Sequence, residues 1–294
     1  MVTSLKRVII FLCTVLPITY VIEFFLMANG GLGHPSASIY LCFIMLIPTF
    51  SVICTQFFTR EGFRSPYLRL NFRENIGKYF LCYFLMQLLV IIGAIVFFCI
   101  FPDRFDGKLT SLSSLIYSQT GQMPTQSSLY SMMAVQLVFS FISGPIVNIV
   151  FAFGEEYGWR GYLFPHLARC TSSFNAAIIT GVIWGIWHAP LIAMGHNYGL
   201  EYPGHPFGGI FAMIIFCIVT GFIYSYFTYK TESVFPAVLM HSALNAFASA
   251  GLYFDYQNTP NPFVGPAPTG IIGGSAFIIF GIVCAVLLRK ECKK

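Results

Sequence analysis

Residues 142–165 read ISGPIVNIVFAFGEEYGWRGYLFP, and this stretch is the most informative part of the chain about its fold. Its first half continues an apolar run that begins near residue 130 and is long enough to cross a bilayer as a helix. Two adjacent carboxylates, Glu155 and Glu156, then follow Gly154. Charged side chains such as Asp, Lys or Arg cost about 2.5–3.5 kcal/mol inside a membrane on the mildest scales, and they usually serve a function there. The glutamate pair therefore marks the first place to look for a site.

The composition predicts an all-α fold, a polytopic membrane bundle of about eight transmembrane helices. Of the 294 residues, 56% are hydrophobic and 9% are charged, and the mean hydropathy is +0.74. A soluble domain carries about 25% charged residues, so this chain lacks the charge to cover a surface that faces water. A transmembrane helix needs about 20 apolar residues. Eight runs approach this length: 8–27, 38–58, 77–101, 130–153, 175–194, 207–229, 234–250 and 269–288.

Lysine and arginine are distributed unevenly among the loops between these runs. Only Arg104 and Lys108 fall on one side, and the other side holds the remaining 14 of the 16 basic residues. Because cytoplasmic loops carry the excess of Lys and Arg, we expect a multi-pass protein of a bacterial cell membrane with both termini cytoplasmic. This bias and anionic lipid headgroups explain the net charge of +5, so no nucleic-acid partner is expected. The 14 residues are Lys6, Arg7, Arg60, Arg64, Arg69, Arg73, Lys78, Arg160, Arg169, Lys230, Arg289, Lys290, Lys293 and Lys294.

The two glutamates are predicted to play different parts. Glu156 and Arg160 are spaced i, i+4, which suits an ion pair on one helix face and would keep Glu156 ionised. Glu155 lies about 100° around the same helix and is free to face another group. A carboxylate in a poorly hydrated cavity binds a proton more readily than in water, as a general base working near neutral pH must.

Polar residues in later runs complement this carboxylate. His188 lies in VIWGIWHAPLI, and Asn245 follows His241 at i+4, so the last two project from one helix face. The imidazoles could donate hydrogen bonds or bind a metal, and the Asn245 amide could stabilise an oxyanion. Each residue alone would also suit a helix–helix contact. Together with Glu155 they form a plausible hydrolase site.

Other ionisable residues receive simpler interpretations. Glu23, near the outer end of the first run, is expected to reach the interface or to bond a neighbouring helix. His34, His196 and His205 fall in outer loops and His166 follows Pro165, and all four histidines are interpreted as solvated. The chain has no H-E-x-x-H, G-x-S-x-G or P-loop motif, and its three aspartates lie in outer loops.

Three motifs in this order resemble a known family. EEYGWR (155–160) matches E-E-x-x-x-R, WGIWH (184–188) approximates F-x-x-x-H, and HSALN (241–245) matches H-x-x-x-N. The set resembles the CPBP (Abi) family of intramembrane endopeptidases, which includes type II CAAX prenyl proteases and bacteriocin-processing and immunity proteins. Trp184 stands where that family usually shows Phe, and we expect this to alter packing more than chemistry. The resemblance divides the chain into residues 1–129, a catalytic core over 130–250, and residues 251–294.

The resemblance also implies roles for the site residues. Glu155 would activate a water, Glu156, Arg160 and His188 would support it, and His241 and Asn245 would stabilise the tetrahedral intermediate. Two histidines and a glutamate could instead complete a zinc triad with an open position. We favour a reaction without a cofactor, because Asn245 is better explained as an oxyanion donor than as a metal ligand.

The substrate is expected to be a membrane-associated peptide or protein that reaches a cavity open toward the cytoplasm. His188 lies deeper in its run than His241 does, so span four must continue inward or spans five and seven must start at different levels. Two other functions remain open: a non-catalytic immunity or scaffold protein with the same fold, and a small transporter. Transport is the weakest, because such proteins usually show paired repeats and none is visible here.

Overall fold

The computed structural model describes residues 2–63, 65–256 and 261–291. The chain is 78% helical, and no β-strand occurs within those ranges. The prediction of an all-α fold is therefore confirmed. Arg64, Lys293 and Lys294, which the orientation count includes, lie outside the described residues.

Within the described residues, six helical stretches are long and apolar enough to cross a membrane, which confirms a polytopic bundle. They are Thr3–Ala28, Ala37–Thr59, Phe72–Ile100, Gln126–Ala168, Phe207–Thr231 and Phe235–Phe254. The predicted spans 175–194 and 269–288 correspond to two shorter helices, α8 (Ser173–Trp187) and α12 (Ser275–Glu291). Span five is short because the chain turns at His188 before a separate helix, α9 (Ala189–Ala193).

The other elements complete the bundle and its loops. The remaining α-helices are α1 (Val2–Ala28), α2 (Ala37–Thr59), α3 (Phe72–Ile100), α4 (Thr110–Thr120), α5 (Gln126–Val138), α6 (Gly144–Gly158), α7 (Phe164–Ala168), α10 (Phe207–Thr231) and α11 (Phe235–Phe247). Short 3₁₀ turns lie at Gly31–Gly33, Pro66–Leu68, Pro102–Arg104 and Leu252–Phe254.

The fourth span is a single helical stretch that continues past the glutamate pair to Ala168. Two π-helical turns, Phe139–Ser143 and Trp159–Leu163, join α5 to α6 and α6 to α7. The expectation that this span continues inward is therefore confirmed. Such π turns are common at functional sites, and the second one holds Arg160.

Three prolines stand in the first turns of α6, α7 and α9, where each follows an earlier helical turn, and other side chains satisfy the carbonyl groups that these prolines leave free. A proline has no N–H to donate to the carbonyl four residues before it. In lipid that carbonyl needs another partner. Before Pro145, Gln87 Nε2 donates to Phe141 O at 2.6 Å. Before Pro165, Ser65 Oγ donates to Gly161 O at 3.1 Å. Before Pro190, Tyr20 Oη donates to Ile186 O at 2.7 Å. These bonds tie the broken helices to α1, α3 and the loop before α3.

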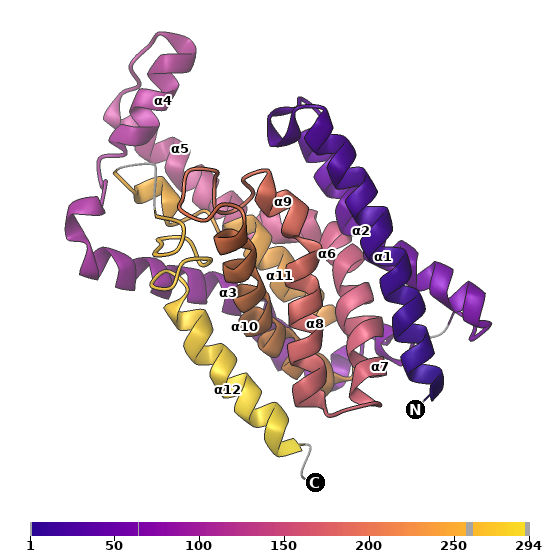
Figure 1. Cartoon of the computed structure of the whole chain (residues 1–294). Coiled ribbons are helices and arrows are strands. Elements are labelled where there is room, and N and C mark those ends of the chain that lie inside the picture. Colours follow the sequence, from indigo (N-terminus) through magenta and orange to yellow (C-terminus); the bar gives the residue numbers. More distant parts are fainter. Residues whose placement is uncertain (1, 64, 257–260, 292–294) are drawn as a thin grey trace.

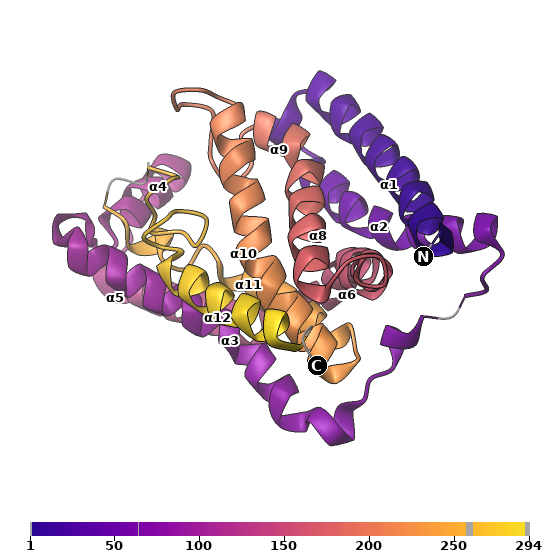
Figure 2. The ribbon, with the colours of Figure 1, turned by 60° about the horizontal axis from the view of Figure 1, so that its bottom comes forward.

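Four helices lie side by side at the centre of the molecule: α6, α8, α10 and α11 (Figures 1 and 2). Helix α2 contacts α6 and α1 packs against α2, while α3 contacts α11 and α12 contacts α10. Two G-x-x-x-G sequences, at 154–158 and 181–185, bring backbones close together, as is usual between membrane helices. A Cβ on Gly154 would lie 2.5 Å from Met45 O of α2, and one on Gly185 would lie 2.5 Å from a Cα of α10. Both glutamates therefore lie on a helix that is pressed against α2.

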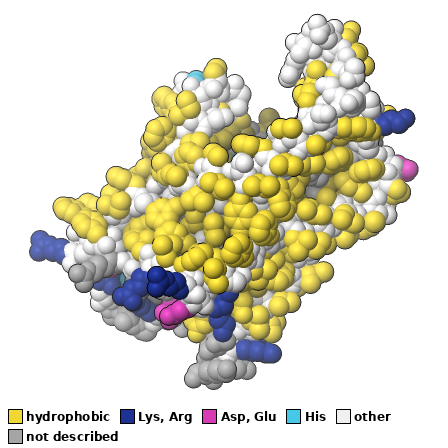
Figure 3. Space-filling view, turned by 180° about the vertical axis from the view of Figure 1, so that it is seen from behind, with side chains coloured by type: hydrophobic (Ala, Val, Ile, Leu, Met, Phe, Trp, Pro, Cys, Tyr) yellow, Lys and Arg dark blue, Asp and Glu magenta, His cyan; other side chains and the backbone are white. Residues whose placement is uncertain are grey.

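The surface carries a broad hydrophobic area on the face shown in Figure 3. Lys and Arg side chains gather mainly at the end of the molecule where α1 begins and α12 ends (Figures 1 and 3). Arg160 is an exception to the orientation count, because it is fully buried inside the fourth span and not in a loop. The cytoplasmic position of this end stays a prediction.

Candidate active site

A cavity of about 350 Å³, here called the catalytic cavity, lies between α2, α6, α8, α10 and α11. Three helices supply the predicted site residues that line it: Glu155, His188, His241 and Asn245. These residues are up to 90 positions apart in sequence, yet the fold brings them to one space. The other two predicted residues, Glu156 and Arg160, are buried behind its wall.

Glu156 and Arg160 form the expected ion pair. Arg160 Nη1 lies 2.9 Å from Glu156 Oε1 and 3.1 Å from Oε2, and neither side chain is exposed. The guanidinium carbon also lies 4.4 Å from the ring centre of Trp184 and 5.0 Å from that of Tyr224. Arg160 Nε and Nη2 have no hydrogen-bond partner among the described residues. The two aromatic faces therefore supply the remaining stabilisation of this buried cation.

The imidazole of His241 connects the two glutamates. Its Nδ1 lies 2.8 Å from Glu156 Oε1, and its Nε2 lies 4.0 Å from Glu155 Oε1. The ring stacks on Tyr224 at 5.9 Å and packs against Trp184 at 5.4 Å. Because a carboxylate only accepts hydrogen bonds, Nδ1 carries a hydrogen atom and donates a hydrogen bond to Glu156. Glu156 thus fixes the orientation of the ring, and Nε2 is directed toward Glu155.

Glu155 is held by two indole groups. Its Oε2 accepts a hydrogen bond from Trp184 Nε1 at 2.8 Å and a longer one from Trp159 Nε1 at 3.4 Å. The side chain is almost fully buried, yet it lines the cavity. Trp184 thus supplies an N–H that a Phe at this position lacks, and whether the change affects packing more than chemistry stays a prediction.

His188 and Asn245 complete the polar lining. His188 Nδ1 lies 2.8 Å from Trp184 O, which makes Nδ1 the donor and leaves Nε2 without its proton when the ring is neutral. Asn245 is exposed within the cavity, and its Nδ2 donates to Asn148 Oδ1 at 3.3 Å. Sequence reasoning missed Asn148, which lies in the same apolar run as the glutamates and could have been noticed as a polar residue there.

Comparison with known proteins supports the assignment of this region. Residues 130–247 match the family model described as type II CAAX prenyl endopeptidase Rce1-like. Residues 130–247 are therefore similar to this family, and they are called the Rce1-like core below. This match confirms the resemblance that the three motifs indicate. The division at residues 129 and 250 stays a prediction.

Curated relatives of the Rce1-like core carry two names. The chain is 32% identical to CAAX prenyl protease 2 of Methanococcus maripaludis over 92 residues, which is 31% of this chain and 34% of the relative. It is 27% identical to lysostaphin resistance protein A of Staphylococcus haemolyticus over 149 residues, 51% of this chain and 38% of the relative. The protein of that name in Staphylococcus epidermidis is 26% identical over 160 residues, 54% of this chain and 38% of the relative. The chain thus spans between a third and two fifths of each relative.

The donor set of the Rce1-like core does not fit a zinc triad as the side chains are arranged. Among the described residues, no group of three His, Cys, Asp or Glu side chains is close enough to hold a metal ion. His188 Nδ1 is bound to a backbone carbonyl, and His241 Nδ1 is bound to Glu156. Each ring keeps its Nε2 free, and one nitrogen is all that a zinc-bound histidine uses, so the misfit lies in the spacing of the side chains.

The catalytic cavity extends to one end of the bundle. The first residue of α1 and the last residue of α12 lie at the opposite end (Figure 1). The lining of the cavity includes His196 and Asn197, which follow α9, and Pro268 and Thr269, which precede α12. The expected opening at the basic end is therefore not found, and whether the opening faces the cytoplasm stays a prediction. Hydropathy alone does not show that α8 ends at Trp187 or that the chain turns at His188.

Three ionisable residues outside the motifs also differ from their sequence interpretation. His196 is not simply solvated: it lines the catalytic cavity, and burial lowers its pKa, which keeps the imidazole neutral. His166 is 7% exposed, and its ring packs at a tilt against Tyr162 with 4.5 Å between the ring centres. Glu23 neither reaches the interface nor bonds a neighbouring helix. It is fully buried, and its carboxylate oxygens have no partner among the described residues.

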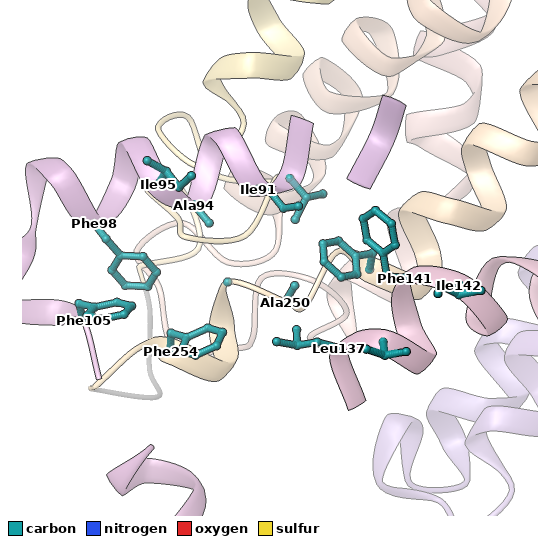
Figure 4. A pocket seen from close by; sticks show the side chains of 14 residues that line it. Ile91, Ala94, Ile95, Phe98, Phe105, Leu137, Phe141, Ile142, Ala250 and Phe254 are labelled. Atoms are coloured by element: carbon teal, nitrogen blue, oxygen red, sulfur yellow. The ribbon is translucent and has the colours of Figure 1, made fainter. Parts of the chain in front are cut away.

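A second cavity of about 430 Å³ lies on another side of α11 (Figure 4). Side chains from α3, from the junction of α5 and α6 and from the end of α11 line it, including Ile91, Phe98, Phe141 and Phe254. None of its lining residues is ionisable. It therefore offers space for an apolar group and no group for catalysis.

Proposed function

We propose that the chain is an intramembrane endopeptidase of the CAAX type that hydrolyses a peptide bond of a membrane-associated peptide or protein. One observation carries this proposal: a carboxylate, two imidazoles and an amide, from Glu155, His188, His241 and Asn245, line a single buried cavity. A general base and donors for an oxyanion are the groups that peptide hydrolysis without a covalent intermediate requires.

Glu155 is the general base in this proposal. Its Oε2 is held by Trp184, so Oε1 faces the cavity and the Nε2 of His241. A water bound to Oε1 and to the free Nε2 of His188 loses a proton to Glu155 as its oxygen attacks the carbonyl carbon of the peptide bond. The carbonyl oxygen then carries the negative charge.

His241 and Asn245 stabilise that charge. The Asn245 amide donates one hydrogen bond, and the imidazolium form of His241 donates another from Nε2 while Nδ1 stays bonded to Glu156. When the intermediate collapses, Glu155 returns its proton to the amide nitrogen and the C–N bond breaks. Glu156 and Arg160 act through His241, whose ring they orient.

The proposed reaction needs no metal or other cofactor. The donor set supports this, because the described His, Cys, Asp and Glu side chains do not gather as a triad. Hydrolysis should therefore persist after dialysis against a chelator. Activity that disappears with the chelator and returns with zinc would overturn this part of the proposal.

The lipid bilayer and a substrate within it are the proposed partners. The name of one relative, CAAX prenyl protease 2, makes a lipid-modified peptide a candidate substrate. The apolar cavity in Figure 4 supports a substrate with an apolar group, since it presents only hydrocarbon and aromatic surfaces. We also propose that both termini are cytoplasmic, from the distribution of Lys and Arg.

The peptide termini present in cell membranes test the function. Membranes are compared from cells that express the wild type, Glu155→Gln, or the matched control Glu74→Gln at an exposed position. New termini should appear with the wild type and with Glu74→Gln, and should be absent with Glu155→Gln. Identical termini in all three samples, with equal amounts of folded protein, would favour the second candidate.

That second candidate is a non-catalytic membrane scaffold or immunity protein. It is favoured by the relatives named lysostaphin resistance protein A, whose matches cover more of this chain than the match to the protease does. Its function would survive Glu155→Gln, because this substitution keeps the size of the side chain and removes only the base.

A further inference from the structure

A third cavity adjoins the catalytic cavity. It lies at the end of the bundle where the loop after α9 is found, away from the first residue of α1 and the last residue of α12. This loop-end cavity has a volume of about 810 Å³ and is lined by residues 197–203 of the loop after α9, by segment 261–269, and by Arg104 and Leu252. Asn197 and Thr269 line both cavities. A chain lying in the loop-end cavity can therefore continue past these two residues to Glu155.

Tyr198 lines the loop-end cavity and carries an unused polar group of the kind that binds a peptide backbone. Tyr198 is only 3% exposed, and its hydroxyl group has no hydrogen-bond partner among the described residues. Burial raises the pKa of Tyr198, so the hydroxyl stays protonated and able to donate. A buried hydroxyl without a partner is unfavourable by about 1–3 kcal/mol, and a ligand carbonyl would remove this penalty.

The charged residues that line the loop-end cavity favour a neutral or basic polypeptide over an anion. Arg104 Nε donates to Asp255 Oδ1 at 2.7 Å, and the Asp255 side chain is fully buried, so this cation is already neutralised. Glu201 is exposed and forms no ion pair with a described residue. The lining thus lacks a free cation among the described residues, which disfavours an anionic lipid headgroup as its ligand.

We propose that the loop-end cavity binds the extramembrane polypeptide segment of the substrate that adjoins the bond to be cleaved. The inference rests on the proposed function and adds the direction from which the substrate enters. With both termini cytoplasmic, this segment lies on the outer side of the membrane. The substrate class is then a membrane-associated polypeptide with a free, extended stretch outside the cytoplasm.

A binding experiment tests this without turnover. Leu200→Cys places a reporter thiol at an exposed position of the loop-end cavity, and Phe63→Cys places a matched thiol in the loop before α3, near the other end. Both are made in the Glu155→Gln protein and labelled in detergent with a hydrophilic maleimide. The signal of Glu155→Gln alone is subtracted to remove labelling of the natural cysteines.

A pool of random-sequence decapeptides should slow labelling of Leu200→Cys at least about threefold, saturably, and leave Phe63→Cys unchanged. Adding Tyr198→Phe, which keeps the ring, should raise the half-saturating concentration about fivefold, the worth of one hydrogen bond. Labelling of Leu200→Cys that the pool does not change would overturn the proposal, as would protection by micelles of an anionic phospholipid alone. Failure here leaves cleavage that depends on Glu155 intact, so the two proposals fail separately.

Discussion

Glu156 and His241 lie 85 residues apart in the chain and share a 2.8 Å contact between Oε1 and Nδ1 in the interior of the bundle. On its other side Glu156 binds Arg160 with both oxygens, so one carboxylate anchors a guanidinium and an imidazole. Glu156 thereby determines which nitrogen of His241 faces Glu155. The paired glutamates are tolerated inside a membrane span because each of them is hydrogen-bonded.

Removing the cation alone should be costly. Arg160→Met leaves Glu156 buried without its charged partner, and breaking a buried ion pair in this way costs about 3–5 kcal/mol. The double variant Arg160→Met/Glu156→Leu should unfold closer to the wild type, since it leaves neither charge unpaired. Thermal unfolding in detergent measures both, with the exposed Arg73→Met as the control. A single variant as stable as Arg73→Met would show that the pair does not hold the site together.

The indole of Trp184 should matter for catalysis through its N–H. Trp184→Phe removes the 2.8 Å hydrogen bond to Glu155 and keeps an aromatic ring over Arg160. Hydrogen bonds to charged groups are worth about 1.5–3 kcal/mol, so kcat should fall about 10- to 100-fold with little change in KM.

Trp187→Phe is the matched comparison for that prediction. It removes an indole bond of the same length, to Thr19 Oγ1, which does not touch Glu155. Steady-state kinetics and thermal unfolding of both variants separate positioning from stability. Equal losses of kcat in the two variants would contradict a special role for Trp184.

Local spacing made part of this site predictable. The i, i+4 rule gave the pair of Glu156 and Arg160, and the same rule gave the common face of His241 and Asn245, because both contacts lie within one helix. Hydropathy gave the helices, since apolar length is a property of the sequence alone. These features are confirmed by the ion pair at 2.9 Å and by the shared cavity.

Contacts between helices were not predictable in this way. The bond from Trp184 to Glu155 and the position of His196 depend on how α8 meets α6 and on where α8 ends. The end of the bundle that the cavity reaches was not predictable for the same reason, because a run of apolar letters does not show which loops the packed helices bring to it. The pattern of a single sequence indicates on which face of its helix a residue lies. Tertiary packing determines which residues of other helices that face contacts.

Asn245 should contribute to the rate more than to the fold. Its amide lines the cavity and is exposed there, so Asn245→Ala should fold normally and lower kcat about 10²- to 10³-fold, the usual cost of losing one oxyanion donor. Asn148→Ala removes only the group that accepts from Asn245 and should have a smaller effect. If Asn148→Ala proves the more harmful, Asn245 is not the donor. Initial rates with a peptide substrate measure both.

Glu23 should limit stability. Both of its oxygens are buried without a partner among the described residues, and such groups cost about 1–3 kcal/mol each to leave unsatisfied. Glu23→Met has a similar length and no polar oxygen, so its midpoint of thermal unfolding in detergent should rise above that of the wild type. A lower midpoint would mean that Glu23 has a bonding partner in the membrane.

The most direct measurement is the turnover of purified protein on a peptide that spans a cleavage site found in cells. If Glu155 is the general base, Glu155→Gln should lower kcat about 10²- to 10⁴-fold while the affinity for the peptide and the thermal unfolding midpoint stay unchanged. Glu74→Gln should match the wild type. A folded Glu155→Gln protein that turns over the peptide as fast as Glu74→Gln does would contradict the account.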